Sequence, residues 1–106
     1  MDNQASRTIT EYKHRLASAG IRIDKLILFG SQAQGKADEH SDLDLLVISK
    51  DFGEMDIWDR MCLLGRARTG MTGPMEILGF TPDEVKDGTA GAFIEKEVLD
   101  KGIEVA

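Results

Sequence analysis

Two aspartates separated by one leucine follow a Gly-Ser turn in this chain, and together these residues could handle a phosphate and a metal ion. Asp42 and Asp44 flank Leu43, while Gly30 and Ser31 come earlier, directly after an apolar run. Alternate residues of a strand point to the same face, so the two carboxylates are expected to stand side by side. Adjacent carboxylates repel unless a cation lies between them, and Mg²⁺ or Mn²⁺ is the usual ion of an all-oxygen site. Because the backbone N–H groups of the turn suit a phosphate, the pattern predicts nucleotide chemistry.

Glu76 is the candidate for a third carboxylate. It is the charged residue in the otherwise apolar segment 75–80. If this segment is a strand beside the one that carries Asp42 and Asp44, the trio could hold two divalent ions for an in-line phosphoryl displacement. Glu76 could also orient or deprotonate the attacking hydroxyl. The competing interpretation is that Glu76 is a solvated residue on an edge strand.

The elements that must position these residues follow from apolar periodicity and turn signals. Thr81 and Glu84 form a capping-box pattern with Pro82 at the first helical position. Helices are predicted by Ile57, Met61 and Leu64 and by Phe93, Ile94 and Val98, each as an apolar side at helical spacing. The predicted order is helix 4–19, strand 22–29, strand 43–49, helix 55–68, strand 75–80, a short helix after Thr81, helix 90–101 and strand 103–105. This order predicts an α/β fold, a small mixed β-sheet packed with helices, in a single domain over residues 1–106.

Two familiar phosphate or metal loops fit the chain poorly. Residues 30–37 nearly match the P-loop pattern, but Ala37 stands where a Ser or Thr hydroxyl would contact Mg²⁺. An EF-hand loop needs a glycine at its sixth position and alternating polar ligands, and the residues after Asp44 are apolar. Both alternatives are therefore disfavoured.

Composition limits the partners. The chain has 106 residues and a formal net charge of −6, which disfavours long-range attraction to nucleic acids or an anionic membrane. Cys62 is the single cysteine, so an intramolecular disulfide is impossible and a reducing, cytoplasmic setting is expected. His14 and His40 lack a partner at metal-ligand spacing, so surface roles are expected for both. Cys62 and the methionines are expected to pack in or against the core.

At Phe29-Gly30-Ser31, followed by the segment Ser41 to Leu45, the chain resembles the DNA polymerase β-like nucleotidyltransferases, and most closely the minimal nucleotidyltransferases. That family transfers a nucleoside monophosphate from an NTP to a hydroxyl with two divalent metals. The resemblance implies that Asp42, Asp44 and Glu76 bind two Mg²⁺ (or Mn²⁺) ions and are catalytic. It also implies nucleotide binding by Gly30, Ser31, Lys36 and Ser41.

The resemblance also implies a partner. Many minimal members act as the antitoxin of a small helical HEPN protein, and some transfer AMP from ATP to a tyrosine of that protein. A non-catalytic antitoxin that covers a HEPN RNase is the main alternative, and transfer to a small molecule is a third. Gln32 and Gln34 stand where the family often has arginine, so these positions offer no charge-assisted contact to a phosphate. Glu76 stands where the family often has aspartate and reaches about one methylene further.

Overall fold

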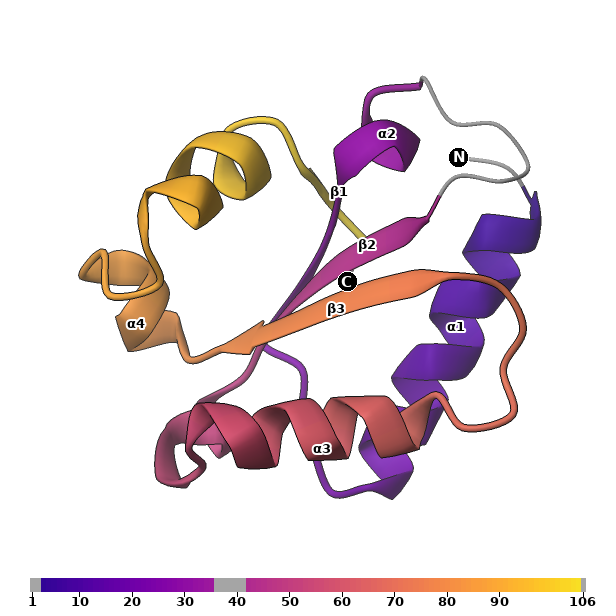
Figure 1. The fold of residues 1–106 in the computed structure, drawn as a ribbon, viewed down its shortest axis with the longest axis horizontal. Helices are drawn as coiled ribbons and strands as arrows, with labels where there is room; N and C mark the ends of the chain where they lie inside the picture. The colour runs from indigo at the N-terminus through magenta and orange to yellow at the C-terminus, as the bar shows by residue number, and fades with distance from the viewer. Residues whose placement is uncertain (1–2, 36–41, 106) are drawn as a thin grey trace.

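The protein is described by a computed structural model that covers residues 3–35 and 42–105. Its centre is a four-stranded mixed sheet in the order β3-β2-β1-β4, with helices on both faces (Figure 1). The elements are α1 (Asn3–Ser18), β1 (Lys25–Phe29), α2 (Gly30–Ala33), β2 (Leu43–Ile48), the 3₁₀ helix η1 (Lys50–Glu54), α3 (Ile57–Ala67), β3 (Met75–Phe80), α4 (Pro82–Lys86), the π-helix η2 (Ile94–Leu99) and β4 (Ile103–Glu104). The predicted α/β class, a small mixed sheet packed with helices, is confirmed.

Strand direction follows from the connections. β1 runs antiparallel to β2 and to β4. β2 and β3 are parallel, and α3 lies between them in the sequence, as a parallel pair requires a crossover connection. The two parallel strands therefore begin at the same end of the sheet, where β2 starts with Leu43 and β3 with Met75.

The strands alternate between two cores. Leu43, Leu45 and Val47 are buried in the larger core with residues of α1 and α3. Leu46 and Ile48 point to the other face, where they pack with residues of η2. Leu43 and Leu45 thus point into the larger core, and Asp44, which lies between them in the strand, is on the face of η2.

Local hydrogen bonds explain most differences from the predicted boundaries. The strand predicted over 22–29 begins at Lys25, because Arg22 and Asp24 bond to the segment that follows β2: Arg22 N–H donates to Asp51 (2.8 Å) and Lys50 N–H donates to Asp24 (2.9 Å). The helix predicted over 55–68 begins after Asp56, whose carboxylate accepts from Asp59 N–H at 2.8 Å. The capping box of α4 is formed as predicted.

Two helix faces differ from the prediction. In α3 the buried residues are Leu64 and, unexpectedly, Arg60, whereas Ile57 and Met61 are exposed. The last helix is a π-helix over Ile94–Leu99, shorter than the predicted 90–101, and Phe93 lies 55% exposed before it. Periodicity locates a helix, but tertiary packing selects which side is covered. No helix in the described ranges is long and apolar enough to cross a membrane.

Candidate active site

The parallel pairing of β2 and β3 brings Asp44 and Glu76 together. The two residues are direct partners in the register of these strands, and Phe29 of β1 is the partner of Asp44 on the other side. The three residues form one row across the sheet. Glu76 does lie on an edge strand and is exposed, as the competing interpretation required. It nevertheless stands beside Asp44, as the acidic-cluster prediction required.

Asp44 is the electrostatic centre of this row. Its pKa is raised from the ordinary 3.8 to about 6, first by burial and then by the negative charges of Glu76 and Asp42. A hydrogen bond with the Glu76 carboxyl raises it further. Two carboxyl groups can form such a bond only when one carries a proton. The neighbouring charges thus make the ionised form of Asp44 less favourable, and a bound cation would offset this repulsion.

The Gly-Ser turn is pressed against the same carboxylate. Gly30 has φ +72°, and a Cβ placed on it would overlap with Oδ2 of Asp44. Only a residue without a side chain allows this backbone conformation and this approach together. The backbone of the turn is therefore in direct contact with the acidic cluster, where a phosphate and a metal ion could share ligands.

The remaining predicted residues are placed in part. Asp42 is exposed and comes just before β2, close enough to Asp44 for its charge to act there. Ser31 is half-buried in α2, next to Gly30. Lys36 and Ser41, predicted to bind nucleotide, lie outside the described residues, as does His40.

One oxygen of the Asp44 carboxylate is a candidate ligand for a divalent cation. Oδ1 of Asp44 is buried and has no hydrogen-bond partner within the described part of the chain, and a buried carboxylate oxygen without a partner is costly. Hard divalent cations prefer such oxygen ligands. In the described ranges no three acidic, His or Cys side chains are already gathered around one point. The cluster is thus an assembly of neighbouring carboxylates rather than a closed cage.

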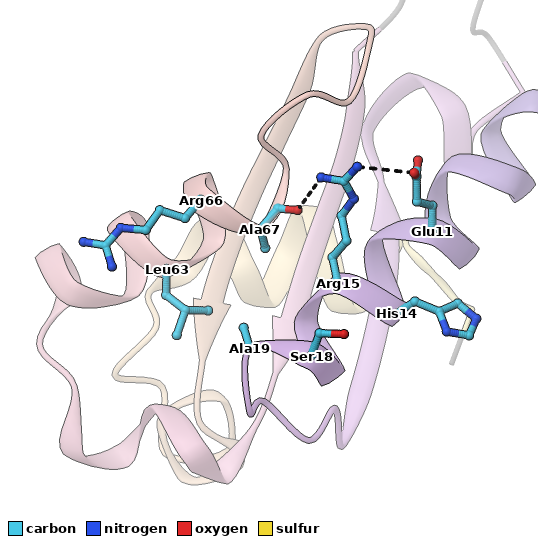
Figure 2. Close-up of a pocket in the computed structure, with 8 residues that line it drawn as sticks. All are labelled: Glu11, His14, Arg15, Ser18, Ala19, Leu63, Arg66 and Ala67. Carbon is cyan, nitrogen blue, oxygen red and sulfur yellow. Dashed lines mark hydrogen bonds and ion pairs between the residues drawn. The ribbon is translucent and has the colours of Figure 1, made fainter.

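A separate pocket lies in the helical layer between α1 and α3, with a volume of about 630 Å³ (Figure 2). Its lining includes His14, Arg15 and Arg66, and none of the predicted site residues. Arg15 contributes to structure there, because it donates to the backbone carbonyl of Ala67 at 3.4 Å and pairs with Glu11 at 3.3 Å. The pocket is on the side of the sheet away from η2, so it is distinct from the row formed by Glu76, Asp44 and Phe29.

The prediction from sequence missed one aromatic residue near the row. Phe93 was expected on the buried side of the last helix, but it is exposed and packs edge-on against Phe29, with ring centroids 6.2 Å apart. No local pattern distinguishes this phenylalanine from a core residue, because its neighbour Phe29 is distant in sequence.

Comparison with known proteins shows the family to which this chain belongs. Residues 9–106 match the sequence model of the nucleotidyltransferase domain. This chain belongs to the nucleotidyltransferase domain family. The resemblance inferred from the Gly-Ser turn and the paired aspartates is thus confirmed. No curated protein matches the sequence.

Solved structures show the same fold for this nucleotidyltransferase. A crystal structure of a Sulfolobus solfataricus protein assigned as a nucleotidyltransferase aligns with a TM-score of 0.63 and 20% identity over 94% of this chain and 80% of that chain. A toxin-antitoxin structure with AMP-PNP aligns with a TM-score of 0.66 and 18% identity over 92% of this chain and 71% of that chain. BolA1 from Arabidopsis thaliana gives a TM-score of 0.53 at 20% identity, over 79% of this chain and 98% of that chain. The backbone arrangement therefore occurs in proteins with different names, and the chemistry must be argued from the site.

Proposed function

We propose that this nucleotidyltransferase moves AMP from ATP to a hydroxyl group, that of a tyrosine on a helical HEPN toxin partner, and so acts as an antitoxin. The observation that carries the catalytic half is the Asp44 carboxylate, which faces Glu76 and Asp42 and touches the Gly30 turn. A phosphate-binding turn and a cation-binding cluster in contact are what the transfer of a nucleotidyl group needs.

The roles of the residues follow from their positions. Gly30 and Ser31 would hold the triphosphate, with Lys36 and Ser41 as further contacts. Asp42, Asp44 and Glu76 would hold Mg²⁺, which when bound neutralises charge on the phosphates and the acceptor oxygen. Gly30 would bring the triphosphate close to Asp44, because its lack of a side chain lets the Asp44 carboxylate approach the backbone of the turn.

The transfer itself forms one bond and breaks one. The acceptor hydroxyl oxygen bonds to the α-phosphorus of ATP, and the bond from that phosphorus to the oxygen bridging to the β-phosphate breaks, so that pyrophosphate leaves. The hydroxyl proton passes to a base, and Glu76 is the candidate because it is the exposed carboxylate of the row. Asp44 and Asp42 would hold the ions and so help to orient the phosphates.

The partner half of the proposal is supported by the outer surface of α3. Ile57, Trp58 and Met61 are 55%, 71% and 60% exposed and form what we call the α3 apolar face. Exposed aspartates at positions 56 and 59 stand beside it. An apolar face with an acidic border suits an amphipathic helix of a partner that carries basic residues beside its apolar side. The neighbouring toxin-antitoxin structure with AMP-PNP supports both the partner class and the nucleotide.

The alternative is a non-catalytic antitoxin that neutralises the toxin by covering it. The α3 apolar face favours this function as strongly as the catalytic one, because binding alone needs no carboxylates. The two candidates differ in whether Asp42 and Asp44 are required for more than folding.

The first test is a calorimetric titration of ATP into the purified protein with Mg²⁺. We expect metal-dependent binding that is lost in the double variant Asp42→Asn/Asp44→Asn. The double variant Asp59→Asn/Asp83→Asn changes the net charge equally at exposed helix positions and should bind ATP normally. Loss of binding in both double variants would indicate a general charge effect instead of a site.

The second test uses the complex with the copurified helical partner. Incubation with ATP and Mg²⁺ should increase the mass of the partner by one AMP, and only when Asp42 and Asp44 are intact. A neutralised partner of unchanged mass would establish the non-catalytic antitoxin.

A further inference from the structure

The row that contains Glu76 and Asp44 ends in a pair of aromatic rings. Phe29, the strand partner of Asp44, is 4% exposed, and Phe93 packs against it with an interplanar angle of 79°. Phe93 itself is 55% exposed. A large aromatic side chain that is open to solvent thus packs against the residue that neighbours Asp44 in the sheet.

The position of Phe93 is fixed although its ring is exposed. It directly precedes η2, and the next turns of that helix are anchored by Ile94 and Val98, which are 3% and 0% exposed. Both pack in the core that also holds Phe29, on the face of the sheet that carries Asp44. Figure 1 shows this last helix, in gold to yellow, on the side of the sheet opposite to α1 and α3. The ring is therefore held in place by its backbone and by Phe29, at the edge of the site.

The spacing along the row suits a nucleotide. Neighbouring strands lie about 4.8 Å apart, so Phe29 is one strand from Asp44, and the Phe93 ring lies 6.2 Å from the ring of Phe29. Phe29 also directly precedes Gly30. A triphosphate held at the Gly30 turn can therefore extend its ribose and base along the row toward Phe93.

We propose that Phe93 is the platform on which the base of the bound nucleotide stacks. This inference rests on the proposed nucleotide site at Gly30 and Asp44. Stacking uses the π-face that every base offers, so Phe93 supplies affinity without hydrogen-bond selection and favours large purine bases over pyrimidines. Phe29 is the positioning residue that fixes the orientation of the Phe93 ring.

The test compares a ligand that has a base with one that lacks it. ATP and inorganic tripolyphosphate are titrated, each with Mg²⁺, into the wild type, Phe93→Ala, Phe93→Leu and Phe93→Trp. Stacking on one aromatic ring corresponds to roughly a 5- to 100-fold change in affinity. We expect ATP affinity to fall by this factor in the Ala and Leu variants and to be retained in Phe93→Trp. Tripolyphosphate affinity should be the same in all four proteins.

Controls separate stacking from damage to the helix. Leu99→Ala removes another exposed apolar side chain from η2, 37% exposed, and should leave both affinities unchanged. Equal loss of ATP and tripolyphosphate binding in the Phe93 variants would overturn the proposal, because it would show a structural effect on the phosphate site. Unchanged ATP binding in Phe93→Ala would overturn it while leaving the nucleotide site intact. A wild type that binds neither ligand would overturn the proposed function and the platform together.

Discussion

Gly30 and Asp44 are in contact, and a Cβ on Gly30 would overlap with Asp44 Oδ2. The contact joins the turn that follows β1 to the strand β2, which are held in register by the pairing of Phe29 with Asp44. A residue that could be regarded as an ordinary turn glycine therefore touches the carboxylate at the centre of the proposed site. Its substitution must disturb both the backbone and the carboxylate.

Gly30→Ala is expected to weaken ATP binding by at least ten-fold, because the new methyl group displaces the Asp44 carboxylate. It should also cost about 1–2 kcal/mol of stability for a left-handed conformation. Gly20→Ala is the matched control, because Gly20 has φ +89° and open space where its Cβ would lie. Calorimetry and thermal unfolding of both variants check the prediction. If Gly30→Ala and Gly20→Ala lose the same stability and bind ATP equally well, the contact of Gly30 with Asp44 has no functional consequence.

Asp44→Asn is expected to stabilise the protein without metal at pH 7.5. The folded-state pKa of about 6 lies above the ordinary 3.8, so the ionised carboxylate destabilises the fold above pH 6. This penalty decreases as the pH falls from about 6 to 4, where the carboxyl group becomes protonated. After allowance for solvent screening, the gain at pH 7.5 is about 1–2 kcal/mol. Urea unfolding at several pH values measures it.

Magnesium should reverse the order of stability of the wild type and Asp44→Asn. We expect Mg²⁺ to raise the unfolding temperature of the wild type, since it relieves the repulsion around Asp44, and to leave Asp44→Asn unchanged. Asp100→Asn, a substitution at an exposed aspartate, serves as the control and should respond as the wild type does. A stabilising Mg²⁺ effect of equal size in Asp44→Asn would place the ion elsewhere.

The sequence predicted the parts of the site that depend on local spacing. Asp42 and Asp44 alternate along a strand, Gly30 and Ser31 follow another, and Glu76 interrupts a third. The placement of Glu76 beside Asp44 depends on strand order, which the parallel register of β2 and β3 provides. Spacing alone left this open, because an edge-strand carboxylate and a cluster carboxylate have the same local pattern.

Burial of charged residues could not be predicted in the same way. Arg60 interrupts the apolar pattern of α3, yet it is 5% exposed, because distant groups accept its hydrogen bonds: Met55 O at 3.0 Å, Gly79 O at 3.3 Å and Glu84. Phe93 shows the converse case, an apolar residue left exposed. Both outcomes depend on tertiary partners that periodicity does not contain.

Glu84→Gln is expected to destabilise the protein at neutral pH by roughly 1–3 kcal/mol, the range for hydrogen bonds to charged groups. Arg60 donates to both carboxylate oxygens of Glu84, at 2.6 and 3.2 Å, and these bonds hold the pKa of Glu84 below its ordinary 4.5. The stabilisation is present above pH 4.5 and is lost as the pH falls through the lowered folded-state pKa. The difference between the two proteins in urea unfolding should therefore disappear in acid. A constant difference down to pH 2 would mean that the charge of Glu84 is unimportant.

The edge of the sheet at β3 is protected by two arginines that reach it from the α3 side. Leu43 N–H donates to Pro74 O, and Ser49 N–H donates to Phe80 O, so the odd-numbered carbonyls of β3 face away from β2. Two of these, Met75 O and Gly79 O, each accept from an arginine at 3.3 Å. Such capping disfavours the addition of a partner strand. The partner is instead expected on the α3 apolar face.

Trp58→Ser is accordingly expected to weaken binding of the helical partner by at least ten-fold, since a large exposed aromatic residue is a typical interface anchor. ATP binding should be unchanged, because Trp58 is on α3, which packs on the opposite side of the sheet from Asp44. Ile103→Ser removes a 46% exposed residue from β4 and is the matched control. Titration of the purified partner into each variant measures the effect. If Ile103→Ser weakens binding and Trp58→Ser does not, the partner contacts the β4 side of the molecule instead.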